Sequence, residues 1–175
     1  MLWTIQNREF YDTLSKEGII YTDGRKIIPY FRKAYKWMVE QMNERGVPTV
    51  KYPIWAWHMY EKGKKKPDLR RKHGARGENM VLIEFDPPKE LVLLSDFIGW
   101  HSVLNGGYHS CSEAEDNKYG DTKSQKLKEK SWLKIFDMTD EGRDEDWIGK
   151  LESIQACLPY LDSEWVVAVK EFSSR

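Results

Sequence analysis

The chain has 175 residues, and its 28 basic and 28 acidic side chains give a formal net charge of zero. Hydrophobic residues make up 40% of the chain and aromatic residues 13%, which excludes an intrinsically disordered protein because this apolar surface offsets the entropy of ordering. The neutral balance also excludes a protein that coats nucleic acid or anionic membranes over its whole surface, although a local basic patch can still act.

Length and the absence of a Pro/Ser-rich linker predict a single domain over residues 1–175. Cys111 and Cys157 are too few and too far apart to form a disulfide framework, and residues 1–4 lack the basic start of a signal peptide. We therefore expect a cytoplasmic protein. No apolar stretch is long enough to cross a bilayer, so we expect no membrane partner.

Short strands and helices alternate in the first half of the chain. Asn7 is a suitable cap for a helix, Gly18 ends it, and Pro29 fits the first position of a second helix. The expected elements are a strand over 2–5, a helix over 7–18, an extended segment over 19–21, a helix over 29–46 and a strand over 50–57. Pro53 places the last of these at a sheet edge or a bulge, because proline cannot donate to a ladder.

The second half combines buried strands with further helices. Apolar runs over 79–86 and 91–94 do not alternate cleanly, which predicts two strands buried on both faces in the middle of a sheet. The remaining expected elements are helices over 96–104, 127–136 and 144–154, loops over 61–78 and 111–130, and a closing hairpin of strands over 155–161 and 165–172. This order predicts an α+β fold with a mixed, largely antiparallel sheet and flanking helices.

The aromatic cluster over residues 52–60 is the most unusual stretch. On a strand, Trp55 and Trp57 point to one face and His58 to the other, so two indoles can wall a flat pocket that stacks a nicotinamide, a base or a sugar. The alternative is that these tryptophans belong to an ordinary core, where aromatic side chains are common.

A basic run follows the tryptophans. Its candidate phosphate ligands are Lys64, Lys65, Lys66, Arg70 and Arg71. Beside the tryptophans this run resembles a stacking platform with an electrostatic funnel for single-stranded nucleic acid. A solvated surface loop explains the same pattern equally well.

Two weaker patterns point to phosphate and metal chemistry. The glycine-containing segment 74–77 precedes a strand, whereas a phosphate-binding loop follows a strand and opens a helix. His101, His109 and Cys111 are zinc-ligand types, but no fourth ligand stands at a finger-like spacing. We expect no metal site.

Gln155 begins a strand directly after an expected amphipathic helix that contains Glu152, which places its amide at the rim of the sheet. A Gln amide there can donate and accept hydrogen bonds with a ribose hydroxyl. The alternative is a Gln that only satisfies backbone groups at the start of the strand.

Two segments carry a resemblance to a known fold. Residues 2–6, with the following helix and residues 17–20, resemble the first motif of the ADP-ribosyltransferase fold, and residues 154–161 with 164–167 resemble its third motif. The whole sequence also resembles a small bacterial domain family without assigned function. The resemblance implies that NAD is the substrate, held by Thr4, Gln6, Trp55 and Trp57, and that Gln155 stands where the family has a catalytic Glu. The first motif also departs from the family, which normally has His or Arg there.

The resemblance implies transfer of ADP-ribose to an acceptor, a nucleic acid among them. Because Gln155 keeps a hydrogen bond but has no charge, three consequences remain: a slow enzyme, another acid such as Glu152 or Glu164, or a protein that only binds NAD. The rival hypotheses are a non-catalytic module for single-stranded nucleic acid and a protein-interaction domain whose tryptophans form the interface.

Overall fold

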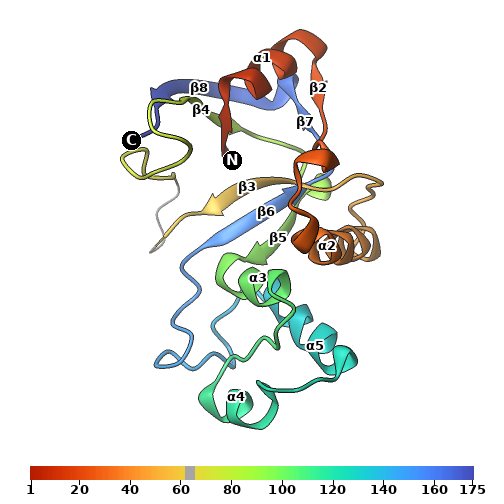
Figure 1. Ribbon diagram of the computed structural model, residues 1–175. Coiled ribbons are helices and arrows are strands. Elements are labelled where there is room, and N and C mark those ends of the chain that lie inside the picture. Colours follow the sequence, from red (N-terminus) through yellow and green to blue (C-terminus); the bar gives the residue numbers. More distant parts are fainter. Residues whose placement is uncertain (62–65) are drawn as a thin grey trace.

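The computed structural model describes residues 1–61 and 66–175 (Figure 1). A six-stranded antiparallel sheet has the order β5-β6-β3-β1-β4-β8. Its strands are β1 (Leu2–Asn7), β3 (Ile54–Met59), β4 (Asn79–Phe85), β5 (Leu93–Asp96), β6 (Ile154–Leu158) and β8 (Val166–Ser173). A separate two-stranded pairing joins β2 (Ile19–Ile20) to β7 (Leu161–Asp162). The predicted α+β class with an antiparallel sheet and flanking helices is confirmed.

The centre of the sheet is asymmetric around β1. β1 pairs with β4 along its whole length, from Leu2 opposite Phe85 to Asn7 opposite Met80. On its other side, β1 pairs with β3 only at Trp3 opposite Trp57. Beyond this point the regular β1–β3 pairing ends, and the Thr4 hydroxyl of β1 donates to the backbone carbonyl of Trp55 in β3.

Five α-helices lie within the described residues: α1 (Arg8–Glu17), α2 (Arg32–Glu44), α3 (Phe97–Leu104), α4 (Glu113–Tyr119) and α5 (Gln125–Trp132). The caps explain where α1 and α3 begin. Asn7 Oδ1 accepts from the backbone N–H of Phe10 at 2.9 Å, and Asp96 Oδ1 accepts from that of Ile98 at 2.9 Å. Gly18 ends α1 at a φ of 79°, a conformation that glycine adopts without strain.

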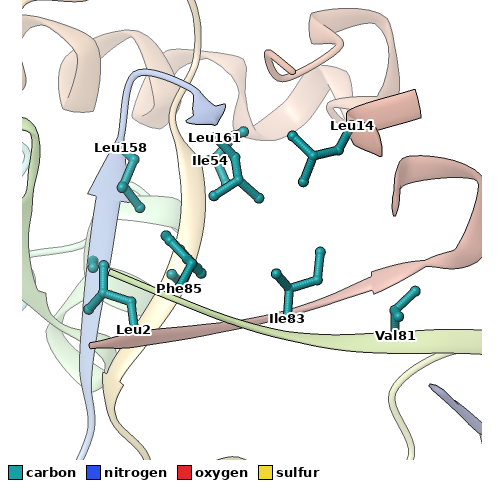
Figure 2. Packing of buried hydrophobic residues seen from close by; sticks show 10 residues of the cluster. Leu2, Leu14, Ile54, Val81, Ile83, Phe85, Leu158 and Leu161 are labelled. Carbon is teal, nitrogen blue, oxygen red and sulfur yellow. The ribbon is translucent and has the colours of Figure 1, made fainter. Parts of the chain in front are cut away.

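Two hydrophobic clusters hold the layers together. The first packs α1 onto the sheet and contains Leu2, Leu14, Ile54, Val81, Ile83, Phe85, Leu158 and Leu161 (Figure 2). The second joins α2, α3 and α5 to the sheet through Met38, Met42, Trp100, Trp132, Ile135 and Cys157. Figure 1 shows α1 near the β4–β8 end and α3, α4 and α5 beyond the β5 end. Both clusters take residues from β6, so this strand ties the two layers to one sheet.

The predicted helix over 144–154 is wrong. Residues 137–153 are turns and irregular segments, and Ile154 already belongs to β6. Gly149 has a φ of 73°, which a right-handed helix cannot continue through. The segment is held by Arg143, whose Nη1 donates to Asp96 Oδ2 at 2.9 Å while its side chain is only 6% exposed.

The predicted loop over 111–130 is also wrong in part, because it contains α4 and the start of α5. Ser112 and Ser124 cap these helices: their hydroxyl oxygens accept from the backbone N–H groups of Glu115 and Leu127. These local capping interactions outweigh the polar composition that suggested a loop.

Three predictions about strand positions need correction. The strand predicted over 50–57 begins later, so that Pro53 precedes β3, and β3 lies inside the sheet between β6 and β1 and not at an edge. Val50, which was expected in this strand, is 97% exposed. β5 is an edge strand and not a central one. The closing hairpin does not form, because β6 lies between β5 and β3 whereas β8 pairs with β4 at the opposite edge.

Candidate functional site

A pocket of about 370 Å³ lies where β1 and β3 separate, and we name it the Trp pocket. It brings together five residues that the sequence singled out: Thr4, Gln6, Trp55, Trp57 and Gln155. Its other lining residues are Ile5, Tyr35, Ala56, His73, Phe97, Trp100, His101 and Leu104. Side chains from β1, β3, β6, α2 and α3 therefore meet at one place, although they are far apart in the sequence.

Strand alternation places the tryptophans and the glutamine. Ile54 and Ala56 are buried in the core of the α1 side, so Trp55 and Trp57, between and beyond them, point away from that core. Trp57 lies directly opposite Gln155 in the β3–β6 register. The amide of Gln155 and the indole of Trp57 therefore belong to the same face of the sheet.

The aromatic walls are packed against one another in two groups. Trp57 contacts Phe97 with ring centroids 4.7 Å apart, and Phe97 contacts His101, also at 4.7 Å. Trp55 packs on Trp100 with centroids 4.8 Å apart. Such contacts hold the rings in fixed positions, so the walls of the pocket are formed before any ligand enters.

The polar groups of the pocket are partly used by the protein itself. Thr4 Oγ1 donates to the backbone carbonyl of Trp55 at 2.9 Å and accepts from Gln6 Nε2 at 2.9 Å. Gln155 is only 5% exposed, and its Nε2 donates to Ser95 Oγ at 3.1 Å. In the part of the chain that the structure describes, Gln155 Oε1 has no protein donor, so this oxygen can accept from a ligand.

Two histidines border the pocket in defined tautomers. His101 Nδ1 lies 2.9 Å from the carbonyl of Phe97, and His73 Nε2 lies 2.8 Å from the carbonyl of Asp68. Because a carbonyl oxygen only accepts, each of these nitrogens carries a proton and donates it to the carbonyl.

Among the described residues, no Asp, Glu, Lys or Arg side chain lines the Trp pocket. Burial raises the pKa of the Tyr35 hydroxyl, which stays protonated at neutral pH. The walls are therefore neutral and aromatic, with amide, hydroxyl and imidazole groups as the hydrogen-bonding partners.

The candidate acids do not lie in this pocket. Glu152 is exposed in the irregular segment before β6, and Glu164 is exposed before β8. Neither belongs to the lining of the Trp pocket. The structure thus brings Gln155, but neither proposed acid, to the place where the third motif was expected to act.

Of the basic run, Lys66, Arg70 and Arg71 do not line the Trp pocket, and Lys64 and Lys65 fall outside the described residues. Lys66 pairs with Glu84 at 2.6 Å, Arg70 with Asp68 at 2.7 Å, and Arg71 with Glu61. Lys66 and Arg70 border a different pocket, of about 460 Å³, against β4 and β8. Of the described residues in the 61–78 segment, His73 reaches the Trp pocket.

The three zinc-ligand candidates divide between two places. His101 borders the Trp pocket, whereas His109 is buried behind α3, with its Nε2 3.8 Å from Cys111 Sγ. Burial lowers the pKa of His109 to about 4. Within residues 1–61 and 66–175, no group of three or more His, Cys, Asp or Glu side chains is arranged to hold a metal ion.

Sequence reasoning missed the pocket residues that helices supply. Tyr35 on α2 and Phe97 and Trp100 on α3 have the spacing of ordinary core residues, and nothing in that spacing distinguishes a pocket wall from a core. The Asp96 cap predicts where α3 begins, but not that the helix lies beside Trp55 and Trp57.

The structure is that of an α+β protein with an aromatic-walled pocket on one face of its sheet. Comparison with protein families places the chain: a domain of unknown function, DUF3841, matches residues 1–129, and the chain belongs to this family. Neither the curated proteins nor the solved structures contained a match. No helix in the described residues has the length and apolar character needed to span a membrane.

Proposed function

We propose that the Trp pocket binds NAD, with the nicotinamide riboside part of the ligand against Trp55, Trp57 and Gln155. The observation that carries this proposal is the convergence of polar side chains from β1 and β6 on one aromatic-walled pocket. The same strands carry the two motifs that resemble the ADP-ribosyltransferase fold.

The chemistry of the walls suits the oxidised nicotinamide ring. This ring is planar and carries a positive charge, and a cation over the face of Trp is attracted by the electrons of the indole. Among the described lining residues there is no Lys or Arg to repel the ring. Gln155 Oε1 can accept a hydrogen bond from a ribose hydroxyl, which gives the sugar a defined orientation.

Catalysis requires a group that stabilises positive charge on the sugar, which NAD binding alone does not. When nicotinamide leaves, the bond from the ribose C1′ breaks with its electron pair on the departing nitrogen, and the sugar becomes positively charged. A carboxylate stabilises that charge, and loss of one such preorganised group typically costs about 10²–10³ in rate. Because Gln155 is neutral and Glu152 and Glu164 lie outside the pocket, we infer that the chain binds NAD and transfers ADP-ribose slowly or not at all.

A nucleic-acid function has weaker support. The described candidates Lys66, Arg70 and Arg71 each form an ion pair with a neighbouring acid, and none of them lines the Trp pocket. A nucleic acid as acceptor, or as the ligand of a non-catalytic module, would need cations that are available to its phosphates.

Calorimetric titration with NAD tests the binding proposal. We expect Trp57→Ala to weaken NAD binding by about 5- to 150-fold, because an aromatic stacking partner contributes on the order of 1–3 kcal/mol. Trp147→Ala is the matched control, since Trp147 is 44% exposed and does not line the Trp pocket. Thermal melting of both variants verifies that they are folded. Absence of NAD binding by the wild type, or equal affinity in a folded Trp57 variant, would overturn the proposal.

The catalytic inference has its own test in Gln155→Glu. Restoring the carboxylate is expected to raise the release of nicotinamide from NAD by about 10²–10³, whereas Gln155→Ala gives no gain. Radiolabelled NAD then shows whether ADP-ribose goes to water, protein or nucleic acid. A Gln155→Glu variant that binds NAD but releases nicotinamide no faster than the wild type contradicts the assigned position of the sugar.

A further inference from the structure

The Trp pocket continues into two larger pockets. It shares Gln6, Tyr35, Trp55 and Leu104 with a middle pocket of about 800 Å³. That pocket in turn shares Tyr21, Thr22, Asp23 and Arg25 with an outer pocket of about 760 Å³. Neighbouring pockets therefore lie side by side, from β6 past the start of α2 to the segment around residues 21–25, and we call this series of three pockets the groove.

A ligand of dinucleotide size needs this groove. The Trp pocket, at about 370 Å³, lies at the small end of the range of about 300–1,000 Å³ that is common for drug-sized ligands, so a ligand as large as a dinucleotide extends beyond it. The rest of NAD has to extend out of the Trp pocket past Trp55 and Tyr35, which line both this pocket and the middle pocket.

The charge of the lining changes along the groove. The described walls of the Trp pocket carry no Asp, Glu, Lys or Arg, whereas Arg25 and Lys26 reach the middle pocket. The outer pocket is lined by the cations Arg25, Lys36 and Lys51 and by the acids Asp23 and Glu40. The middle pocket also has two acids, Glu9 and Asp23.

The two cations of the middle pocket come from one short turn, Gly24–Lys26, and differ in their partners. Arg25 Nε and Nη2 each donate to Asp23 at 3.0 Å, and its side chain is 91% exposed. Within the described residues, Lys26 forms no ion pair. Asp23 thus occupies the Nε–Nη2 edge of Arg25, which leaves Nη1 of Arg25 and the ammonium group of Lys26 as the donors of this turn that can reach a phosphate group.

We propose that Arg25 and Lys26 bind the pyrophosphate of the ligand whose nicotinamide end lies in the Trp pocket. This assignment rests on the proposed function. The adenosine then lies in the outer pocket, where Tyr21 and Tyr52 supply aromatic surface and Lys51 Nζ lies 5.0 Å from the centre of the Tyr21 ring. The groove is thus a site for a dinucleotide and not for a free nucleobase.

Charge reversal with three probes tests the assignment. The variant is Arg25→Glu with Lys26→Glu, and the matched control is Arg32→Glu with Lys33→Glu, two exposed cations that line none of the three pockets. Both variants change the net charge equally. The probes are NAD, ADP-ribose, which lacks nicotinamide, and nicotinamide riboside, which lacks phosphate.

We expect the Arg25/Lys26 variant to bind NAD and ADP-ribose at least about tenfold more weakly and nicotinamide riboside as the wild type does. The control variant should keep the affinity for all three probes. Unchanged NAD affinity in the Arg25/Lys26 variant, or equal losses in both variants, overturns the pyrophosphate assignment and leaves the Trp pocket proposal standing. Binding of ADP-ribose that depends on Arg25 and Lys26, without any binding of nicotinamide riboside, overturns the nicotinamide position instead. A wild type that binds none of the probes refutes both.

Discussion

The Trp pocket and the basic segment Glu61–Glu78 are both rich in groups that bind nucleotides, but they are built in different ways. Apart from His73, which the basic segment supplies, the described walls of the Trp pocket come from β1, α2, β3, α3 and β6, and the sheet and its helices fix their positions. In the basic segment, Arg70 pairs with Asp68 and Arg71 with Glu61, within the segment itself. Cations with acids so close in sequence neutralise one another locally, whereas a pocket made by distant strands exists only in the complete fold.

The largest expected effect comes from removing the residues that complete the sheet. A chain of residues 1–129, the part that the family matches, lacks β6, which lies between β5 and β3. It also loses Leu158 and Ile135, which are fully buried in the two hydrophobic clusters. We expect this chain to show no cooperative thermal transition by circular dichroism. A sharp melt with native-like secondary structure would mean that the Trp pocket does not depend on the complete sheet.

The second prediction concerns the buried pair that anchors α3 beside the pocket. Arg143 and Asp96 have side chains that are 6% and 1% exposed, and Asp96 also caps the helix that carries Phe97 and Trp100. Arg143→Met leaves a buried carboxylate without its partner, so we expect the free energy of unfolding to fall by about 3–5 kcal/mol in urea titrations. The control is Arg71→Met, which breaks an exposed pair with Glu61. Equal effects of the two substitutions would contradict the difference between the regions.

A third prediction uses pH. Burial lowers the pKa of His109 from its ordinary 6.5 to about 4, so the unfolded chain takes up a proton at a higher pH than the folded one. Stability is then complete above about pH 6.5 and falls by up to a few kcal/mol as the pH drops toward 4. Urea titrations between pH 7 and pH 4 measure this loss. In the His109→Gln variant, the free energy of unfolding should depend less steeply on pH over that range. An identical dependence in both proteins would show that the pKa of His109 is not lowered in the folded state.

The smallest effect is expected in the basic segment. Lys66 and Glu84 form an exposed ion pair, and the hydrogen bond from Lys66 lowers the pKa of Glu84. Lys66→Met should cost about 0–1 kcal/mol at pH 7, because water screens the pair. Since the folded-state pKa of Glu84 is the lower one, this difference should vanish as the pH falls through it. Thermal melts of the two proteins at pH 7 and pH 3 are the measurement, and a loss above about 2 kcal/mol at pH 7 would contradict the account.

Local interactions explain which parts of the fold could be predicted from the sequence. Asn7 and Gly18 bound α1, and Asp96 caps α3, because a cap is a contact between residues two or three apart. The apolar spacing at Trp147 and Ile148 predicted a helix that Gly149 prevents with its positive φ. The edge position of β5 depends on which strands pair, and pairing between distant segments leaves no local signal.

The candidate site shows the same division. Thr4, Gln6 and Gln155 could be named from the resemblance of two motifs, and Trp55 and Trp57 from strand alternation. Tyr35, Phe97 and Trp100 could not, because their place in the pocket depends on how α2 and α3 pack on the sheet. The ion pairs of Lys66, Arg70 and Arg71 were missed since each acid partner is one of many nearby.

The central claim is that NAD enters the Trp pocket, and the indole N–H signals of the eight tryptophans test it most directly. In a ¹⁵N-tryptophan-labelled sample titrated with NAD, the account predicts saturable shifts for Trp55 and Trp57, with Trp147, in the exposed loop, unmoved. The signals are assigned by substituting one tryptophan at a time. If the indole signals of Trp55 and Trp57 do not shift while NAD is added to saturation, or if the signal of Trp147 alone shifts, the account is contradicted.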